Sequence, residues 1–566
     1  MKKVLLCVMV ILLPVTIFAQ TVTVDNTDSS PDNVSTFDSI MMALHSFQSE
    51  GAVVASTDGS GVGVNNGNSI PNVIEIVGTG TVYDEIVRID ERSASGGYCV
   101  LNEDLVIKGI AGAEDKPIVA PNDDGGNDDD AFEIRTDVNL EIRNIVFMWD
   151  PDYPDGSTYG VYLMTLDLLN TTSGSPSTML VKDCVFTGAD ASGQPLVTNK
   201  DEALINRISD YVPPAGGEPG RTLGIFPDQD EGLIATVEDC VFSHASQLDS
   251  SRAAQILVFF GGIGSSWTEE VGADIKSCII SFNAGPGVEM QSGGNSNDAA
   301  LQYVNITGTN AKAGGIASGE PTIIYNQGNA SLPGNGAGLF MFDSSNDTAF
   351  TADLNNVWMI NLTGRAIQGN VMGGGDNGFW SLDDSLILNT NTQSGTSAIM
   401  SGWRSVTPTA PSTLSITDST IISGNSSTED DGAVINLLGD TAMNNALTLN
   451  MDNVILGKSR TAAGTLNGIL NEGPVTVNVT DSVIIESGSF AIDGTSALNT
   501  GTGAINQTNV LNVDPQLKYF VPMNDVEYYA VMNQSLAAAQ SGGEDLDGGR
   551  IIGTPPTNAH NWNMYE

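Results

Sequence analysis

A short pattern of alternating apolar and polar positions recurs along most of the chain. Its first and third places are apolar, the residue between them is usually polar, and the fifth place is Asn, Asp or Ser. Alternation with a period of two predicts a β-strand with one buried face, and the small polar residue after it predicts a bend. The copies begin at Leu140, Met179, Ala235, Ala273, Leu301, Ala352, Trp380, Leu414, Leu449 and Val477.

The spacing of the copies predicts the architecture. The shortest distance between copies is 28 residues, as between Ala352 and Trp380. A unit of this length with several short strands and no helical pattern fits one coil of a parallel β-helix, and longer gaps are expected to hold loops. A second phrase, rich in Gly or Ala and then apolar, predicts another strand in each coil. It begins at Ala284, Lys312, Thr363, Ser394, Asp431 and Ser487.

Stacked coils place equivalent residues in columns about 4.8 Å apart. At the next place after the bend, Cys184, Cys240 and Cys278 fall in one column. We expect them to fill the core as small apolar side chains rather than to form a redox pair or bind a metal as thiolates. Side chains at the fifth place are expected to satisfy the backbone at each bend and to bond along the stack. That column is predicted to hold Asn144, Asp183, Asp239, Ser277, Asn305, Asn356, Asp384, Asp418, Asn453 and Asp481.

The first residues have the pattern of a secretory signal peptide. Lys2 and Lys3 precede an apolar run from Val4 to Ala19, after which the composition becomes polar. The run is shorter than the roughly 20 residues that span a bilayer. We therefore expect cleavage near Ala19 and a secreted or cell-surface protein whose mature chain lacks a transmembrane segment.

Charge and composition exclude several functions. The chain has 21 Lys and Arg against 68 Asp and Glu, a net charge of −47, so neither nucleic acid nor an anionic membrane is an expected partner. Five Cys and three His, without a CxxC pair, predict neither a disulfide scaffold nor a zinc site. No organic cofactor is expected.

Sequence blocks near both ends carry a resemblance to a family. Thr36–Leu44, Ile74–Asp90 and Leu105–Ala120 resemble an opening cap helix followed by the first coils, and Asp514–Leu517, Glu527–Gly542 and Asp545–Gly553 resemble a closing segment. With the repeats between them, the chain resembles secreted right-handed parallel β-helix proteins of the pectate-lyase-like superfamily. This implies an all-β solenoid with an N-terminal cap and first coils (20–120), a core (121–513) with inserted loops at 148–178 and 187–233, and a C-terminal capping segment (514–566).

The resemblance leaves the activity open, because this superfamily includes lyases, hydrolases, esterases, adhesins and structural proteins. A glycoside hydrolase would need two carboxylates about 5 to 10 Å apart. Candidate catalytic pairs are Asp383 with Asp384 and Asp430 with Asp431. Asp384 is also expected at a bend, and an acidic loop at 430–431 is usually only solvated.

Calcium is the expected cofactor, if any. The segment 121–132 concentrates carboxylates around two Gly, and hard oxygen ligands on a flexible loop suit calcium. The alternative is a solvated acidic loop. The candidate ligands are Asp123, Asp124, Asp128, Asp129 and Asp130.

Aromatic residues suggest where a ligand binds. Trp149, Tyr153 and Tyr159 lie in the first inserted loop, where they either stack on sugars or pin the loop to the coil. The leading hypothesis is a non-enzymatic, calcium-stiffened β-helix that binds a polysaccharide or cell-surface glycan through its two inserted loops. The alternative is a calcium-dependent polysaccharide lyase or glycoside hydrolase.

Overall fold

The computed structural model describes a part of the chain made mostly of strands and the bends between them. The described residues are 21–27, 36–46, 63–64, 72–90, 100–101, 104–120, 132–135, 138–149, 162–167, 177–190, 192–205, 221–227, 233–244, 254–260, 270–283, 285–292, 302–308, 312–313, 316–317, 321–325, 337–343, 350–360, 362–371, 378–390, 397–403, 413–423, 434–438, 447–458, 469–472, 475–484, 504–512, 517–521, 528–531 and 563–564.

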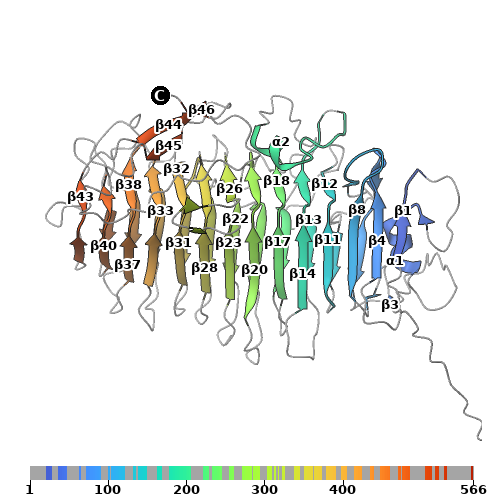
Figure 1. The fold of residues 1–566 in the computed structure, drawn as a ribbon. Helices are drawn as coiled ribbons and strands as arrows, with labels where there is room; N and C mark the ends of the chain where they lie inside the picture. Colours follow the sequence, from blue (N-terminus) through green and yellow to red (C-terminus); the bar gives the residue numbers. More distant parts are fainter. Residues whose placement is uncertain are drawn as a thin grey trace, which may run out of the picture.

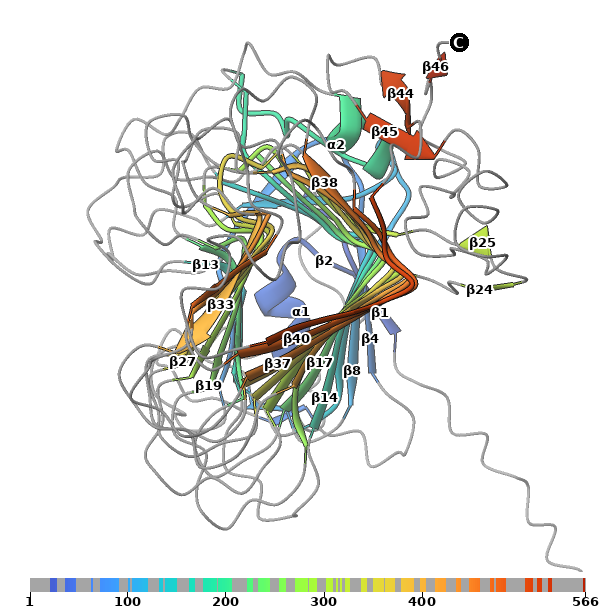
Figure 2. The same ribbon diagram turned by 90° about the vertical axis from the view of Figure 1, so that its left-hand side faces the viewer.

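The fold is a right-handed parallel β-helix, as the repeats and the resemblance predicted. Three long sheets, in which every neighbouring pair is parallel, run the length of a rod (Figure 1), and an end-on view shows them enclosing one core (Figure 2). We call the 15-stranded sheet I, the 13-stranded sheet II and the 11-stranded sheet III. Each coil passes from sheet I through a tight bend to sheet II, then to sheet III, and returns to sheet I.

Sheet I contains β1 (Thr21–Val24), β2 (Thr36–Phe37), β4 (Asn72–Val77), β8 (Leu105–Ile110), β11 (Leu140–Arg143), β14 (Ser177–Lys182), β17 (Leu233–Glu238), β20 (Val271–Lys276), β23 (Gln302–Thr307), β28 (Phe350–Asn355), β31 (Gly378–Asp383), β34 (Thr413–Thr417), β37 (Leu447–Asp452), β40 (Val475–Thr480) and β42 (Ala504–Thr508). Sheet II contains β5 (Val82–Asp84), β9 (Ile118–Ala120), β12 (Val146–Met148), β15 (Val185–Thr187), β18 (Val241–Ser243), β21 (Ile279–Ser281), β26 (Thr322–Tyr325), β29 (Val357–Ile360), β32 (Leu386–Thr390), β35 (Thr420–Ser423), β38 (Ile455–Lys458), β41 (Val483–Ile484) and β43 (Leu511–Asn512).

Sheet III contains β6 (Val87–Asp90), β10 (Phe132–Arg135), β13 (Tyr162–Asp167), β16 (Arg221–Phe226), β19 (Ile256–Phe260), β22 (Val288–Ser292), β27 (Leu339–Asp343), β30 (Ile367–Val371), β33 (Ile399–Trp403), β36 (Ile435–Leu438) and β39 (Ile469–Glu472). The second sequence phrase therefore marks sheet III at β22, β30, β33 and β36. At 312–317 the prediction is wrong, because β24 (Lys312–Ala313) and β25 (Ile316–Ala317) pair antiparallel outside the three sheets. The last copy, from Ser487, lies outside the described residues.

The bends between sheets I and II have the left-handed backbone conformation that small polar residues tolerate. Asn144, Asp183 and Asp239 have φ of 57°, 53° and 57°, and the same conformation recurs at most of the predicted column. Side chains bond along the stack as expected, since Asn453 Nδ2 donates to Asp418 Oδ1 at 2.8 Å.

The predicted bend residue of one coil, Asn305, is wrong. Asn305 lies on β23, paired with Asp274, and its Nδ2 donates to Asp274 Oδ1 at 2.7 Å. The bend of this coil is at Gly308, whose N–H donates to Asn355 O as the other bend residues do to theirs. An Asn on the outer face of a strand and an Asn at a bend are indistinguishable by residue type, which shifted the assignment by three residues.

The outer face of sheet I carries a ladder of alternating charges in its first half. Lys182 Nζ lies 3.2 Å from Glu238 Oε1, and Lys276 Nζ lies 4.0 Å from the same oxygen. Arg143 instead pairs within its own strand, with Glu141 at 3.0 Å. These pairs are partly exposed, and pairs of this kind contribute about 1 kcal/mol or less each.

Aromatic and thiol side chains form columns in the core. The rings of Phe147, Phe186 and Phe242 stack from coil to coil with centroids 5.0 and 4.7 Å apart. Cys184, Cys240 and Cys278 are fully buried and not disulfide-bonded. Burial raises the pKa of the Cys240 thiol. Its Sγ donates a hydrogen bond to a backbone carbonyl oxygen, and the hydroxyl group of Ser385, in the same column, does the same. The column thus has the small, buried filling that the sequence favoured.

A short helix, α1 (Ile40–Ser46), lies at the N-terminal end of the stack against β1, β2, β4 and β6. Ile40, Ala43 and Leu44 are completely buried in the common core. The Glu85 carboxylate receives hydrogen bonds from the Ile40 N–H at 2.8 Å, the Met41 N–H at 3.2 Å and Ser39 Oγ at 2.8 Å. Glu85 therefore satisfies the first amide groups of α1 from a distant part of the chain.

We expect replacement of Glu85 to loosen this end of the rod. Glu85→Ala removes three hydrogen bonds and should lower the free energy of unfolding by about 1 to 2 kcal/mol. Burial raises the pKa of the Glu85 carboxyl, although its hydrogen bonds act in the opposite direction, so the folded protein loses stability as pH rises from the pKa of the unfolded chain to this raised pKa. Chemical denaturation at several pH values should show that the free energy of unfolding of Glu85→Gln falls less with rising pH than that of the wild type. An equal fall in both proteins would contradict this prediction.

The last described strands lie along the flank of the rod. β44 (Leu517–Val521) pairs antiparallel with β45 (Tyr528–Val531) and with β46 (Asn563–Met564), and β45 contacts β32 in the later coils of sheet II (Figure 1). The closing role expected of 514–566 stays a prediction. Among the described residues, no helix is long and apolar enough to cross a membrane.

Candidate functional site

A segment inserted after β15 folds over the outside of sheet II. We call residues 188–190 and 192–205 the strap; it ends in α2 (Lys200–Ile205), which contacts β18 and β21. It belongs to the 187–233 insertion that the sequence predicted as a binding loop. Figure 1 shows α2 on the flank of the rod above β18.

The strap lies there because the outer face of sheet II is apolar. Val146, Val185 and Val241 occupy one register column and point outward, away from the phenylalanine stack. Together with Ile279 they form a buried cluster with strap residues Ala189, Val197 and Ala203. Burial of such side chains stabilises the docked strap by about 25 cal/mol per Å² of apolar surface.

Polar contacts fix the position of the strap. Ser281 Oγ donates to the Ala203 carbonyl at 2.8 Å, and Lys200 Nζ lies 2.9 Å from Asp239 Oδ1 at the bend of the neighbouring coil. The start of α2 is capped by Asn199, whose Oδ1 accepts from the Glu202 N–H at 3.0 Å. The Glu202 carboxylate in turn accepts from the Thr198 N–H at 2.7 Å.

A tight turn at Asp190 positions the first part of the strap. Its Oδ1 accepts hydrogen bonds from the backbone N–H groups of Ser192 at 2.8 Å and Gln194 at 3.0 Å. Hydrogen bonds from Gln194 and Ser192 hold the pKa of the Asp190 carboxyl below its usual value. This turn brings Gln194 and Pro195 over the end of sheet II.

The opposite wall is the turn between β8 and β9. The Glu114 N–H donates to the Gly78 carbonyl at 2.8 Å, and the Gly112 N–H donates to the Glu114 carbonyl at 3.0 Å. A Cβ atom at Gly78 would lie 2.3 Å from the Glu114 carbonyl oxygen, so only glycine allows this turn to pack directly on the previous coil. The location of Glu114 is therefore fixed by backbone contacts.

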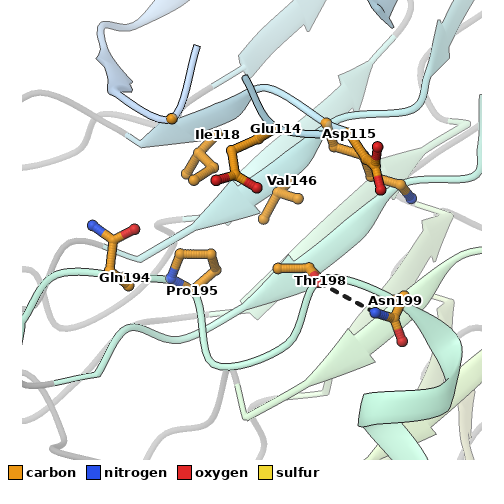
Figure 3. A pocket seen from close by; sticks show the side chains of 10 residues that line it. Glu114, Asp115, Ile118, Val146, Gln194, Pro195, Thr198 and Asn199 are labelled. Atoms are coloured by element: carbon orange, nitrogen blue, oxygen red, sulfur yellow. Dashed lines mark hydrogen bonds between the residues drawn. The ribbon is translucent and has the colours of Figure 1, made fainter. Parts of the chain in front are cut away.

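A cavity of about 320 Å³ opens between these two walls (Figure 3). Its apolar surface is small, because Ile118 and Val146 are buried beneath the strap and only Pro195 is partly exposed. The Glu114 carboxylate lies beside Ile118 and Val146 and faces Pro195 and Gln194, whereas Asp115 lies on the side of the rim above Thr198 and Asn199. The complete lining is Gly80, Glu114, Asp115, Lys116, Ile118, Val146, Gln194, Pro195, Thr198 and Asn199.

The polar groups that line the cavity differ in the hydrogen bonds that they make within the protein. Lys116 Nζ donates to the Asp183 carbonyl at 2.5 Å, and Thr198 Oγ1 donates to Glu202 Oε2 at 3.0 Å. Asn199 Nδ2 donates to Thr198 Oγ1 at 3.3 Å while its Oδ1 caps α2, and Gln194 Nε2 donates to the Gly193 carbonyl at 3.3 Å. The side chains of Gln194 and Glu114 are exposed to solvent. The cavity thus combines an aliphatic surface with hydrogen-bonding groups accessible to solvent.

A buried histidine network lies beneath α2. His244 is 5% exposed and its ring stacks on Phe282 with centroids 4.9 Å apart. Its Nδ1 lies 2.6 Å from Ser243 Oγ, which lies 3.0 Å from Ser281 Oγ, the group that bonds α2. His244 Nε2 has no hydrogen-bond partner among the described residues. Burial lowers the pKa of His244 to about 3.

In one predicted catalytic pair, both carboxylates occupy positions within the repeating framework of the coils. Asp383 lies on the outer face of sheet I, where it accepts hydrogen bonds from Asn355 Nδ2 at 2.9 Å and Thr417 Oγ1 at 2.5 Å. Asp384 is the buried bend residue, with φ of 51°. Asp430 and Asp431 lie outside the described residues, as do the calcium candidates Asp123, Asp124, Asp128, Asp129 and Asp130.

The predicted aromatic ligand site is not assembled as expected. Trp149 is 1% exposed and belongs to the main core, because it follows β12 in the inward direction and its N–H donates to the Thr187 carbonyl. Its ring is therefore not available for stacking on an external sugar, and its burial fits the alternative, in which it pins the loop to the coil. Tyr153 and Tyr159 lie outside the described residues.

Comparison with known proteins adds no assignment. The chain matches no known family model and no curated protein. Within the described ranges, no three His, Cys, Asp or Glu side chains gather in a way that could hold a metal ion.

Proposed function

We propose that this protein is an exported or cell-surface β-helix that binds glycan in the cavity between the strap and the β8–β9 turn. The observation that carries the proposal is the lining, which places amide, carboxylate and hydroxyl groups around a small apolar surface at Pro195. A sugar ring has an apolar face and a rim of hydroxyl groups, and it is recognised by such a combination. The volume suits one or two sugar rings, at the small end of ligand cavities.

The scaffold supports binding by a preorganised site. The strap is held by an apolar cluster, a Lys200–Asp239 ion pair and a capped helix, and the opposite turn is held by backbone hydrogen bonds. A site whose walls are fixed before the ligand arrives loses little conformational entropy on binding. Secretion, and stiffening by calcium at 121–132, are parts of the same proposal.

The test is glycan-array binding by the purified protein and by Gln194→Ala. We expect oligosaccharide binding by the wild type and a loss of about 10-fold in affinity for Gln194→Ala, because one amide that can both donate and accept is removed. Gln507→Ala is the matched control, since Gln507 is exposed on the last coil, far from the cavity. Absence of binding to every glycan, or equal loss in both variants, would contradict the proposal.

A further inference from the structure

We infer that the hydrogen-bond chain from His244 to α2 is an acid-sensitive latch, which holds the strap on sheet II at neutral pH and weakens its docking in acid. The latch consists of His244, Ser243, Ser281 and the carbonyl group of Ala203. It acts on the strap itself and does not depend on which ligand the cavity binds. Because the strap forms one wall of the cavity, its release would also take that wall apart.

The hydrogen bonds of the latch run in one direction. Ser281 Oγ lies 2.8 Å from the Ala203 carbonyl oxygen and 3.0 Å from Ser243 Oγ, which in turn lies 2.6 Å from Nδ1 of the histidine ring. A hydroxyl group has one proton to donate, and a carbonyl group can only accept. Ser281 therefore donates to Ala203 and accepts from Ser243. This leaves Ser243 to accept from an N–H at His244 Nδ1, so the chain is complete when the imidazole is neutral and Nε2 carries no proton.

A second proton on the ring has no place in the docked structure. His244 is 5% exposed, and its Nε2 has no hydrogen-bond partner among the described residues. A proton added there would leave a positive charge and an unsatisfied N–H donor in a buried site beside the Phe282 ring. Burial accordingly lowers the pKa of His244 to about 3. The docked strap therefore opposes protonation of this histidine.

The charged groups described around the latch do not offset this cost. On α2 they are Lys200, which pairs with Asp239, and Glu202, which caps the start of the helix. On sheet II, the nearest titratable side chain in the later coils is Tyr325 of β26, two coils beyond β18. Burial is the cause of the lowered pKa of His244, and none of these groups contributes to it.

The strap is the part that must move for a proton to reach the ring. Ser243 and Ser281 share a register column on the outer face of sheet II, beneath Ala203. The strands that carry them belong to a continuous parallel ladder, whereas the strap is attached by a small apolar cluster, a helix of six residues and an ion pair. Local openings begin at the least stable element. Release of the strap is therefore the opening of lowest cost that admits water to His244.

The two pKa values set the size of the effect. With the strap released, the imidazole protonates near pH 6.5, whereas in the docked state its pKa is about 3. The docking equilibrium should therefore weaken about 30-fold between pH 7.5 and pH 5. Carboxyl groups ordinarily titrate below this window, so the histidine is the group whose charge changes within it.

Hydrogen–deuterium exchange of the full protein, followed by mass spectrometry, measures this opening. After correction for the intrinsic effect of pH on exchange, the protection of strap peptides should fall about 30-fold between pH 7.5 and pH 5. Peptides of β34 and β37 should keep their protection. His244→Asn should abolish the fall in the strap, because Asn does not titrate and tolerates the left-handed backbone of this position.

Lys200→Gln is the matched control, because it removes the ion pair with Asp239 and leaves the imidazole in place. It should lower the protection of the strap at both pH values and keep the 30-fold ratio, and it serves as the test if His244→Asn does not fold. Equal protection of the wild-type strap at both pH values, or an equal fall in wild type and His244→Asn, would overturn the latch. Loss of the ratio in Lys200→Gln would assign the acid response to the ion pair and overturn it too.

Discussion

Phe186→Ala should lower the free energy of unfolding by about 3 to 5 kcal/mol. Phe186 is fully buried between Phe147 and Phe242, and its ring stacks on both within 5.0 Å. Truncation leaves a cavity in the middle of a column, where the rigid β-ladders on both sides limit collapse. The neighbouring rings also lose their stacking partner, which adds to the loss of buried apolar area.

Chemical denaturation followed by circular dichroism measures this effect. Phe259→Ala is a suitable control, because Phe259 lies on sheet III with a partly exposed side chain and its ring is 6.1 Å from Phe226. We expect a loss of about 1 kcal/mol for the control. Losses of equal size in the two variants would show that the Phe186 column is not a tightly packed part of the core.

Acid should destabilise the protein through His244. The folded state keeps this histidine neutral, because burial lowers its pKa to about 3, whereas the unfolded chain protonates it near pH 6.5. Its stabilising contribution is therefore complete above pH 6.5 and is lost as pH falls toward 3. The loss is about 1.4 kcal/mol per pH unit within this window, and on the order of 5 kcal/mol in total.

His244→Asn tests this prediction. Asn tolerates the left-handed backbone of this position, where φ is 58°, and it does not titrate. Carboxyl groups contribute equally to both proteins, so the difference in stability between pH 7 and pH 4 isolates the histidine. We expect the variant to be less stable at pH 7 but to lose less stability on acidification. A parallel decline in both proteins would rule out a buried neutral His244.

The repeats predicted most of the fold because their period is set by the backbone. Alternation at Leu140 and Ile142 identified a strand, and Asn144 identified the bend that follows it. The same logic failed at Asn305, since a polar column also runs along the outer face of sheet I and uses the same residue types. The sequence left two alternatives open for Trp149, and only the closed coil shows that its ring packs in the core.

The cavity was not predicted, because its walls are far apart in sequence. Glu114 and Gln194 meet only because parallel stacking puts β9, β12 and β15 side by side. A signal was nonetheless present in sheet II. Val185 and Phe186 are adjacent and apolar, which indicates a strand buried on both faces, and a buried outer face requires a covering segment. The strap, with Val197 and Ala203, is that segment.

The most direct measurement is a crystal structure of the protein with an oligosaccharide that binds on the array. We expect the sugar in the cavity between the strap and the β8–β9 turn, with its ring beside Pro195 and its hydroxyl groups bonded to Gln194 and the Glu114 carboxylate. An oligomer bound elsewhere on the rod, with the cavity between the strap and the β8–β9 turn empty, would contradict it.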